Sequence, residues 1–283
     1  MENNDRIKPI HIEEVFKSKN PRMAKMIPGF VYRFLKRLIH EEGINEFIER
    51  YGDRKGLAFA DGMVEYLQVT YDVIGEEHLP EADGRYIFVS NHPLGGPDGV
   101  ILISFLGKHY PRLKFPVNDI LLNLKNLNDI FLPINKHGGM AKEAVTAIEE
   151  AYASDAQIIM FPAGLVSRKT KEGIRDLTWQ KSFVAKAVQH RRDIVPIFIS
   201  GQNTNFFYRL ANFRKRIGLK ANLEMLCLPD ETFKKRGQHL TIHIGTPIPW
   251  QSLDRSRKPA EWAELIKGKV YDLAQKHQEH TRP

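Results

Sequence analysis

Residues 86–106 have the sequence YIFVSNHPLGGPDGVILISFL. The apolar run at 86–90 is typical of a buried strand, and the run at 99–106 is typical of a buried helix. The glycine-rich turn between them carries His92 and Asp98. In α/β proteins reactive groups gather at the carboxyl ends of central strands, where a carboxylate can hold one imidazole nitrogen while the other accepts a proton. The alternative is structural, with Asp98 a helix cap and His92 an ordinary loop residue.

Around this unit the chain alternates between short apolar runs and amphipathic segments. We expect an α/β fold with a mostly parallel, mixed sheet flanked by helices. Residues 1–68 are expected to form an N-terminal amphipathic helical segment at a membrane interface, and residues 69–283 the α/β domain. The expected strands lie at 69–74, 86–90, 114–116, 130–134, 157–161, 193–200 and 240–244. The expected helices lie at 44–51, 56–67, 99–106, 140–154, 178–190 and 261–277.

Composition limits the class of protein. The 283 residues include 42% hydrophobic residues, enough for a sizeable core, and a single cysteine, Cys227. A lone cysteine excludes an internal disulfide framework and fits a reducing compartment. Residues 1–14 are polar and mixed in charge, which argues against a signal peptide, and the apolar runs are too short to cross a membrane. We expect a cytoplasmic protein, peripheral on the inner face of the cell membrane.

Charge predicts an anionic partner, because the net charge is +8. Residues 15–40 contain no Asp or Glu, and basic residues there are interleaved with Phe and Met at helical spacing, with a break expected at Pro28-Gly29. Such segments are typical of helices that lie on an anionic membrane surface, the alternative being a helix that covers the domain. A second basic and aromatic cluster at 206–220 suits lipid headgroups or single-stranded nucleic acid. Since no nucleic-acid motif accompanies it, we expect a membrane and no nucleic acid.

Four loops follow expected strands, at 92–98, 135–136, 161–168 and 200–205. The carboxyl ends of parallel strands share one edge, so we expect these loops to converge on one cleft. The sequence contains no Gly-x-Ser-x-Gly motif, which disfavours a serine hydrolase. His239 and His243 fall in a strand-like segment, where their spacing does not give the helical histidine pair of zinc sites, so we expect no metal.

Four blocks in this order resemble those of the lysophospholipid acyltransferase (glycerolipid acyltransferase) superfamily. The blocks are Asn91-His92 with Asp98, residues 131–136, Phe161-Pro162-Ala163-Gly164, and Val195-Pro196-Ile197. The resemblance covers residues 70–250 and is closest to the bacterial hemolysin-like branch, which includes enzymes that acylate lyso forms of ornithine and glycine lipids. It implies transfer of a fatty acyl chain to a lyso-lipid hydroxyl from an acyl thioester, carried by acyl carrier protein or coenzyme A, with no further cofactor.

The resemblance also implies roles for individual residues. His92 would be the general base and Asp98 would orient it, and no serine is needed because the substrate brings its own hydroxyl. Backbone amides of Gly95, Gly96 or Gly164 are candidates to stabilise the oxyanion. The other candidate substrate-binding residues are Asn91, expected to brace the loop, Phe161 and Pro162 of the third block, and the cations Lys136 and Arg168. The alternative for the two cations is that they are ordinary solvated surface charges.

Two departures from the family pattern bear on the substrate. The family usually places four residues between its His and Asp, whereas here five intervene, an insertion that a bulge at a glycine can absorb. Ala163 stands where the third block usually has Glu, a residue associated with acceptor binding in the glycerol-phosphate enzymes. This change shifts the expected acceptor from lysophosphatidic acid toward another lyso-lipid, such as a lyso-aminolipid. The alternative function is a non-catalytic lipid- or protein-binding member of the same fold.

Overall fold

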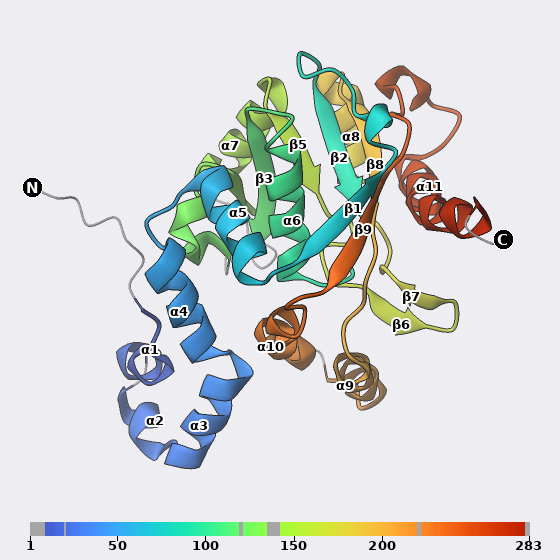
Figure 1. The fold of residues 1–283 in the computed structure, drawn as a ribbon. Helices are drawn as coiled ribbons and strands as arrows, with labels where there is room; N and C mark the ends of the chain where they lie inside the picture. The colour runs from blue at the N-terminus through green and yellow to red at the C-terminus, as the bar shows by residue number, and fades with distance from the viewer. Residues whose placement is uncertain (1–8, 20, 119–120, 135–141, 220–221, 281–283) are drawn as a thin grey trace, which may run out of the picture.

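A seven-stranded sheet forms the centre of the part of the chain that the computed structural model describes, residues 9–19, 21–118, 121–134, 142–219 and 222–280. The strand order is β1-β9-β8-β2-β5-β3-β4 (Figure 1). Five neighbouring strands are parallel, namely β8 (Asp193–Ile199), β2 (Tyr86–Ser90), β5 (Gln157–Met160), β3 (Leu113–Asn118) and β4 (Phe131–Ile134). β9 (His239–Ile244) pairs antiparallel with β8 and parallel with β1 (Thr70–Ile74). The predicted mostly parallel, mixed sheet is confirmed.

Helices cover both faces of the sheet because the central strand is apolar on both sides. Alternate residues of β2 point to opposite faces, and all five are buried. Tyr86 and Phe88 belong to a core shared with α5 (Gly56–Tyr66) and α6 (Gly96–Leu106). Ile87 and Val89 belong to a second core on the other face. That core is shared with α7 (Lys142–Ala153), α8 (Ser182–His190) and α11 (Pro259–His280).

Four helices at residues 12–51 extend from one side of the domain. They are α1 (Ile12–Lys19), α2 (Pro21–Met26), α3 (Gly29–Leu38) and α4 (Glu41–Tyr51). The predicted break at Pro28-Gly29 is confirmed, since extended Pro28 is the N-cap of α3. His40 separates α3 from α4 in a left-handed conformation, and its Nε2 lies 2.8 Å from Asp230 Oδ1. This contact ties the segment to α10 (Leu228–Phe233).

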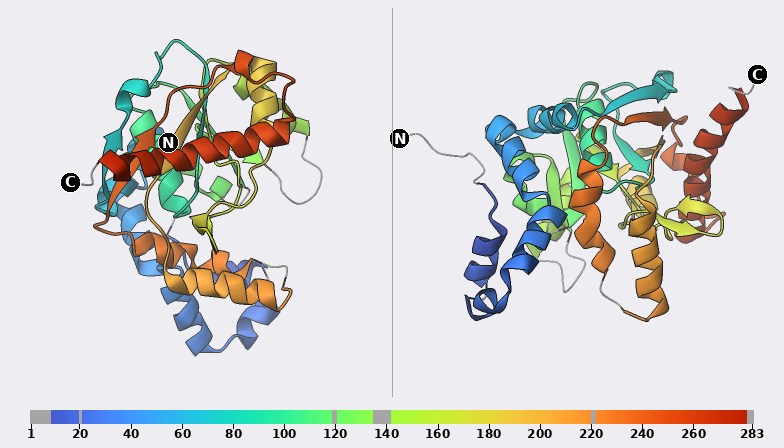
Figure 2. Two further views of the ribbon diagram at one scale, coloured as in Figure 1. Left: turned by 90° about the vertical axis from the view of Figure 1, so that its right-hand side faces the viewer. Right: turned by 60° about the horizontal axis from the view of Figure 1, so that its bottom comes forward.

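Several elements were not predicted from the sequence. A two-stranded hairpin, β6 (Arg168–Thr170) and β7 (Gly173–Arg175), leaves the sheet beside α11. α9 (Asn205–Arg216) and α10 lie on the same side of the molecule as the N-terminal helices (Figure 2). The remaining elements are single 3₁₀ turns: η1 (Glu76–His78), η2 (Leu121–Asn123), η3 (Lys125–Leu127), η4 (Leu223–Cys227) and η5 (Trp250–Ser252). Among the described helices, none is both long and apolar enough to cross a bilayer.

Candidate active site

His92 and Asp98 meet in the turn that joins β2 to α6. His92 Nδ1 lies 3.0 Å from Asp98 Oδ2, and the carboxylate is fully buried. The same oxygen accepts the backbone N–H groups of Leu94 at 2.8 Å and Gly95 at 3.0 Å. Asp98 therefore caps α6 and holds the imidazole at once. An ionised carboxylate requires the proton on Nδ1, which leaves the Nε2 lone pair open.

The five residues between His92 and Asp98 fit because Gly95 has a φ of 97°. Only glycine adopts such a conformation without strain, and it allows the chain to turn back onto the start of α6. A methyl group added at Gly95 would also lie 3.1 Å from a methyl carbon of Leu228. The turn therefore closes at a glycine with five residues between His92 and Asp98.

The imidazole of His92 stacks on Phe161, the first residue after β5. The ring centroids are 4.2 Å apart and the planes differ by 17°. Phe161 is in turn held by an edge-to-face contact with Phe115 of β3. The His92 side chain is 18% exposed, and no described group hydrogen-bonds to its Nε2. The ring is therefore fixed on one face and at Nδ1, with Nε2 left for a substrate proton.

Asn91 braces the loop, as expected, by pairing with the backbone of β8. Its Nδ2 donates to Ile199 O at 2.9 Å, and its Oδ1 accepts from Ile199 N at 2.7 Å. The side chain is buried, so both ends of the amide are used in joining the β2 turn to the neighbouring strand.

Asp176 is a supporting residue that the sequence analysis missed. Its Oδ1 accepts the backbone N–H of His92 at 3.2 Å and the Ser167 hydroxyl, and its Oδ2 accepts Trp179 Nε1 at 2.9 Å. Ser167 N donates to His92 O at 2.8 Å, so both backbone polar groups of His92 are bound. Burial raises the pKa of Asp176 above its ordinary value of 3.8, against the lowering effect of these hydrogen bonds. The only sequence signal is an acid three residues before a tryptophan, which is weak.

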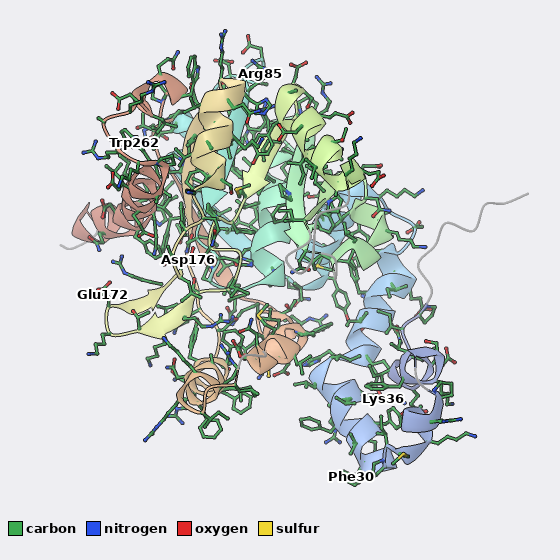
Figure 3. The ribbon with its side chains drawn as sticks, turned by 180° about the vertical axis from the view of Figure 1, so that it is seen from behind. Phe30, Lys36, Arg85, Glu172, Asp176 and Trp262 are labelled. Carbon is green, nitrogen blue, oxygen red and sulfur yellow. The ribbon has the colours of Figure 1, made fainter. Side chains whose placement is uncertain are left out.

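A hollow of about 460 Å³ lies behind Asp176, between the β6–β7 hairpin and α11. Its walls carry charges of both signs, and Figure 3 shows Glu172 on the hairpin and Asp176 closer to the sheet. The lining residues are Thr170, Lys171, Glu172, Arg175, Asp176, Glu264, Lys267 and Gly268. None of them belongs to the 92–98 loop, so this hollow adjoins the support of the site and not His92 Nε2.

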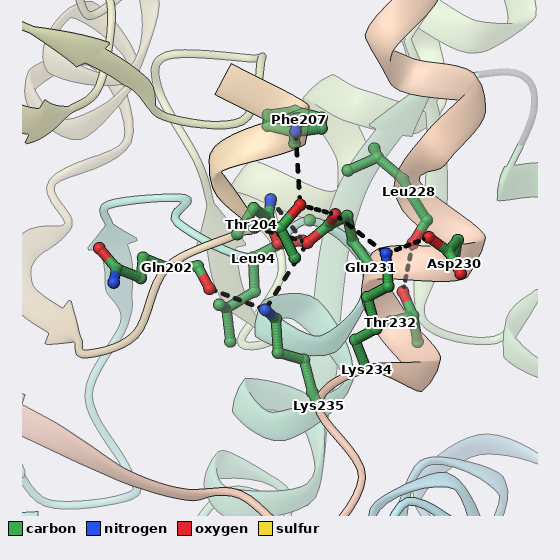
Figure 4. A network of polar contacts seen from close by, with 12 residues as sticks. Leu94, Gln202, Thr204, Phe207, Leu228, Asp230, Glu231, Thr232, Lys234 and Lys235 are labelled. Carbon is green, nitrogen blue, oxygen red and sulfur yellow. Dashed lines mark hydrogen bonds and ion pairs between the residues drawn. The ribbon is translucent and has the colours of Figure 1, made fainter. Parts of the chain in front are cut away.

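The loop after β8 reaches the same turn from the opposite side. Asn203 Nδ2 donates to Pro93 O at 3.2 Å. Buried Glu231 accepts the Thr204 backbone N–H at 2.8 Å, and Lys235 Nζ donates to Gln202 O at 2.7 Å (Figure 4). Burial lowers the pKa of Lys235, opposed by the charges of Glu231 and Asp98. The loops at 92–98, 161–168 and 200–205 contact one another as predicted, and the expectation that they line one cleft stays a prediction. Residues 135–136 lie outside the described residues.

The candidate oxyanion donors differ in availability. The N–H of Gly95 is already donated to Asp98, and the N–H of Gly164 is donated to Phe161 O at 2.9 Å. Gly96 is exposed at the first position of α6, and no described group accepts its N–H. Within the described structure, the N–H of Gly96 is the one of these three that is not already donated, and it lies at the positive end of a helix.

The two candidate headgroup cations have different positions. Lys136 lies outside the described residues. Arg168 is buried, and its Nη2 lies 2.7 Å from Glu224 Oε1. Glu224 is itself buried and also lies 2.9 Å from Arg214 Nε. Arg168 is thus neither solvated nor unpaired, since its charge is already matched within the protein.

The third block is built mainly from packing. Pro162 is buried and its carbonyl accepts Gln180 N at 2.9 Å. Ala163 lies in the apolar core with Trp179. Among the described residues, no group of three His, Cys, Asp or Glu side chains could hold a metal ion.

Comparison with known proteins gives one family match, two similar relatives and one similar structure. A model of an acyltransferase family (Acyltransf_2) matches residues 14–278. The chain is 46% identical over 265 residues to the lyso-glycine lipid O-acyltransferase of Bacteroides thetaiotaomicron, covering 93% of this chain and 97% of that protein. It is 44% identical over 271 residues to the protein of the same name from Phocaeicola vulgatus, covering 95% and 97%. The crystal structure of the 1-acyl-sn-glycerophosphate (LPA) acyltransferase PlsC of Thermotoga maritima matches at 17% identity and a TM-score of 0.46, over 93% of this chain and 86% of that one.

Proposed function

The chain belongs to the acyltransferase family, and we propose that it esterifies the hydroxyl of a lyso-glycine lipid with a fatty acyl chain. The acceptor is inferred from the two relatives, which match this chain over nearly its whole length. Ala163 in the third block agrees with an acceptor other than a glycerol phosphate. The observation that carries the proposal is His92 held at Nδ1 by a buried carboxylate, with no group in the described part of the chain bonded to Nε2.

In the proposed reaction His92 is the general base. Its Nε2 takes the proton of the acceptor hydroxyl while the hydroxyl oxygen forms a bond to the thioester carbonyl carbon. The carbon–sulfur bond then breaks, and the leaving thiolate takes the proton from the imidazolium. The products are an ester and a free thiol, and His92 returns to its neutral form. Asp98 stabilises the imidazolium and fixes the tautomer throughout.

We assign the oxyanion to the start of α6. The thioester oxygen becomes negative when the acceptor attacks, and it needs hydrogen-bond donors at that moment. The undonated amide of Gly96 and the positive end of the α6 dipole supply them from the same turn that holds His92. One loop thus carries both the base that takes the proton and the amide that stabilises the oxyanion.

Acyl carrier protein or coenzyme A carries the acyl donor in this proposal. Lys136 is retained as a candidate cation for the acceptor headgroup. Arg168, whose charge Glu224 already neutralises, is assigned to holding the loop after β5. Asn91, Phe161, Pro162 and Gly164 shape the site around His92, with Asn91 acting through the backbone.

The N-terminal helices are proposed to lie on the inner face of the cell membrane. Met26 is 81% exposed, Phe30 66% and Phe34 61%, all on α2 and α3. The same helices carry Lys25, Arg33 and Arg37 and no acidic residue. Apolar side chains that sit beside cations in this way suit an anionic lipid surface, from which the acceptor would be drawn.

The proposal is tested with purified full-length protein, lyso-glycine lipid and radiolabelled acyl thioesters of coenzyme A and of acyl carrier protein. We expect a diacylated product with at least one donor, and a loss of rate of about 10³-fold in His92→Ala, within the usual range for a general base. His239→Ala is the matched control, because that histidine also contacts an aspartate but lies on the surface. Undiminished transfer by His92→Ala, with its fold intact, would contradict the mechanism, and no product with either donor would contradict the activity.

A further inference from the structure

α9 carries apolar side chains on two opposite faces. Phe207, Tyr208 and Ala211 are buried against the domain. Phe206 and Phe213 point outward, one heptad apart, and are 61% and 60% exposed. Ile217 continues this outer stripe at 58% exposed. A helix that already buries one apolar face gains nothing in the isolated protein from a second one.

Cations flank the outer stripe. Arg209 and Arg216 lie beside the stripe on the helix surface, are exposed, and form no ion pair with a described carboxylate. α9 contains no Asp or Glu. Arg214 differs, since its side chain turns back to the buried Glu224. The outer face therefore combines large apolar groups with uncompensated positive charge, and it complements a surface that is apolar beneath and negative on top.

The position of α9 relates this face to the site. Figures 1 and 2 show α9 on the same side of the molecule as α2 and α3, the side toward which β2 points. Thr204 is the N-cap of α9, and its backbone N–H is held by Glu231 beside the His92 loop. Whatever binds α9 therefore meets a helix that starts at the active site.

We propose that the outer face of α9 is a second membrane contact, seated in the anionic leaflet together with α2 and α3. This rests on the proposed function only in that the acceptor is a membrane lipid. Two contacts define an orientation that one alone does not. When both contacts lie in the leaflet, the edge of the sheet that carries His92 faces the bilayer. A lyso-lipid can then reach His92 Nε2 while part of it remains in the membrane interface.

The test measures vesicle binding by the full-length protein, with phosphatidylcholine vesicles that contain or lack phosphatidylglycerol. Replacing Arg209 and Arg216 together with Ser should weaken binding to the anionic vesicles about 25-fold, since each cation near an anionic surface contributes about fivefold. Phe213→Ser should weaken it about fivefold. The matched control is Arg255→Ser with Lys258→Ser, two exposed cations on the segment between β9 and α11, far from α9 in Figure 1. That control should bind as the unaltered protein does.

The α9 variants should keep their rate on acceptor dispersed in detergent, where docking is not needed. Anionic vesicle binding equal to that of the unaltered protein would overturn the inference. So would unchanged vesicle binding combined with slower transfer only from acyl carrier protein, because α9 would then be a protein-docking face. If the unaltered protein binds vesicles through α9 but acylates nothing, the proposed function fails and the membrane contact stands.

Discussion

Two His–Asp pairs in this molecule have the same separation but very different surroundings. His92 Nδ1 lies 3.0 Å from Asp98, and His239 Nε2 lies 3.0 Å from Asp72. The carboxylate of Asp98 is fully buried, whereas the side chains of His239 and Asp72 are 55% and 72% exposed. The second nitrogen of His239 is bound to Thr70 Oγ1 at 2.8 Å, while that of His92 has no hydrogen-bond partner among the described residues. The distance between the two side chains therefore does not identify a site.

What separates the pairs is the number of constraints on the histidine. The ring of His92 is held by a hydrogen bond to Asp98 and by stacking on Phe161. Its backbone is held by hydrogen bonds to Asp176 and Ser167. A pre-positioned base does not have to be ordered again when the substrate arrives, which lowers the entropy cost of the reaction. An exposed pair such as His239–Asp72 is solvated and contributes little. The comparison can be tested by removing one constraint at a time.

The largest effect is expected from Asp98→Asn. The amide oxygen can still accept the two backbone N–H groups, but the charge that stabilises the imidazolium is lost. We expect kcat to fall about 10³-fold, which corresponds to about 4 kcal/mol in the barrier. The measurement is the steady-state rate of acyl transfer. Asp72→Asn changes the surface pair in the same way and should leave kcat within about twofold; equal losses in both variants would remove the distinction between the pairs.

A smaller effect is expected from Asp176→Asn, a substitution at a positioning residue. The amide keeps one acceptor oxygen for His92 N and Ser167 but turns an N–H₂ group toward the N–H of Trp179. We expect about a tenfold fall in kcat with little change in KM, because the loop shifts but the substrate contacts remain. Asp254→Asn, at an exposed carboxylate, is the control. An equal rise in KM would instead indicate general damage to the site.

Asp176→Asn should also change how the stability of the protein depends on pH. Because the pKa of Asp176 is raised in the folded protein, the folded state binds more protons than the unfolded state above pH 3.8. The contribution of this group to stability is therefore complete below that pH and is lost as pH rises through the raised pKa. Asp176→Asn should abolish that decline, which is measured as the difference between the two proteins in free energy of unfolding across the acidic range. Parallel curves would contradict a raised pKa for Asp176.

The smallest effect is expected from Phe161→Leu. Leucine keeps the apolar character but removes the ring that stacks on His92, an interaction worth about 1 kcal/mol. We expect about a fivefold fall in kcat. Phe233→Leu removes a ring stacked on His40, whose centroids are 4.5 Å apart, and should leave kcat within about twofold. A larger loss in Phe233→Leu than in Phe161→Leu would mean that the stack on His92 does not position it.

The longer helices and strands could be predicted from the sequence because the local spacing of their apolar residues indicates which faces are buried. β2 is apolar at every position and lies between two layers, and α6 is buried along nearly its whole length. The β6–β7 hairpin was missed because its strands have three residues each, most of them polar. The outer stripe of α9 was noticed only as a basic and aromatic cluster, since its exposure depends on what the opposite face of the helix packs against.

The sequence by itself determined that His92 and Asp98 share one turn at the end of a central strand, because six residues of chain cannot separate them far. It also determined the glycine that lets the turn close. Only the tertiary structure decided that Asp176 holds the backbone of His92 from 84 residues away, and that Glu224 neutralises Arg168 from 56 residues away. Local patterns record how much of a segment is buried. Which polar groups contact each other in the protein interior depends on how distant segments pack together, and this cannot be predicted from the sequence of one segment.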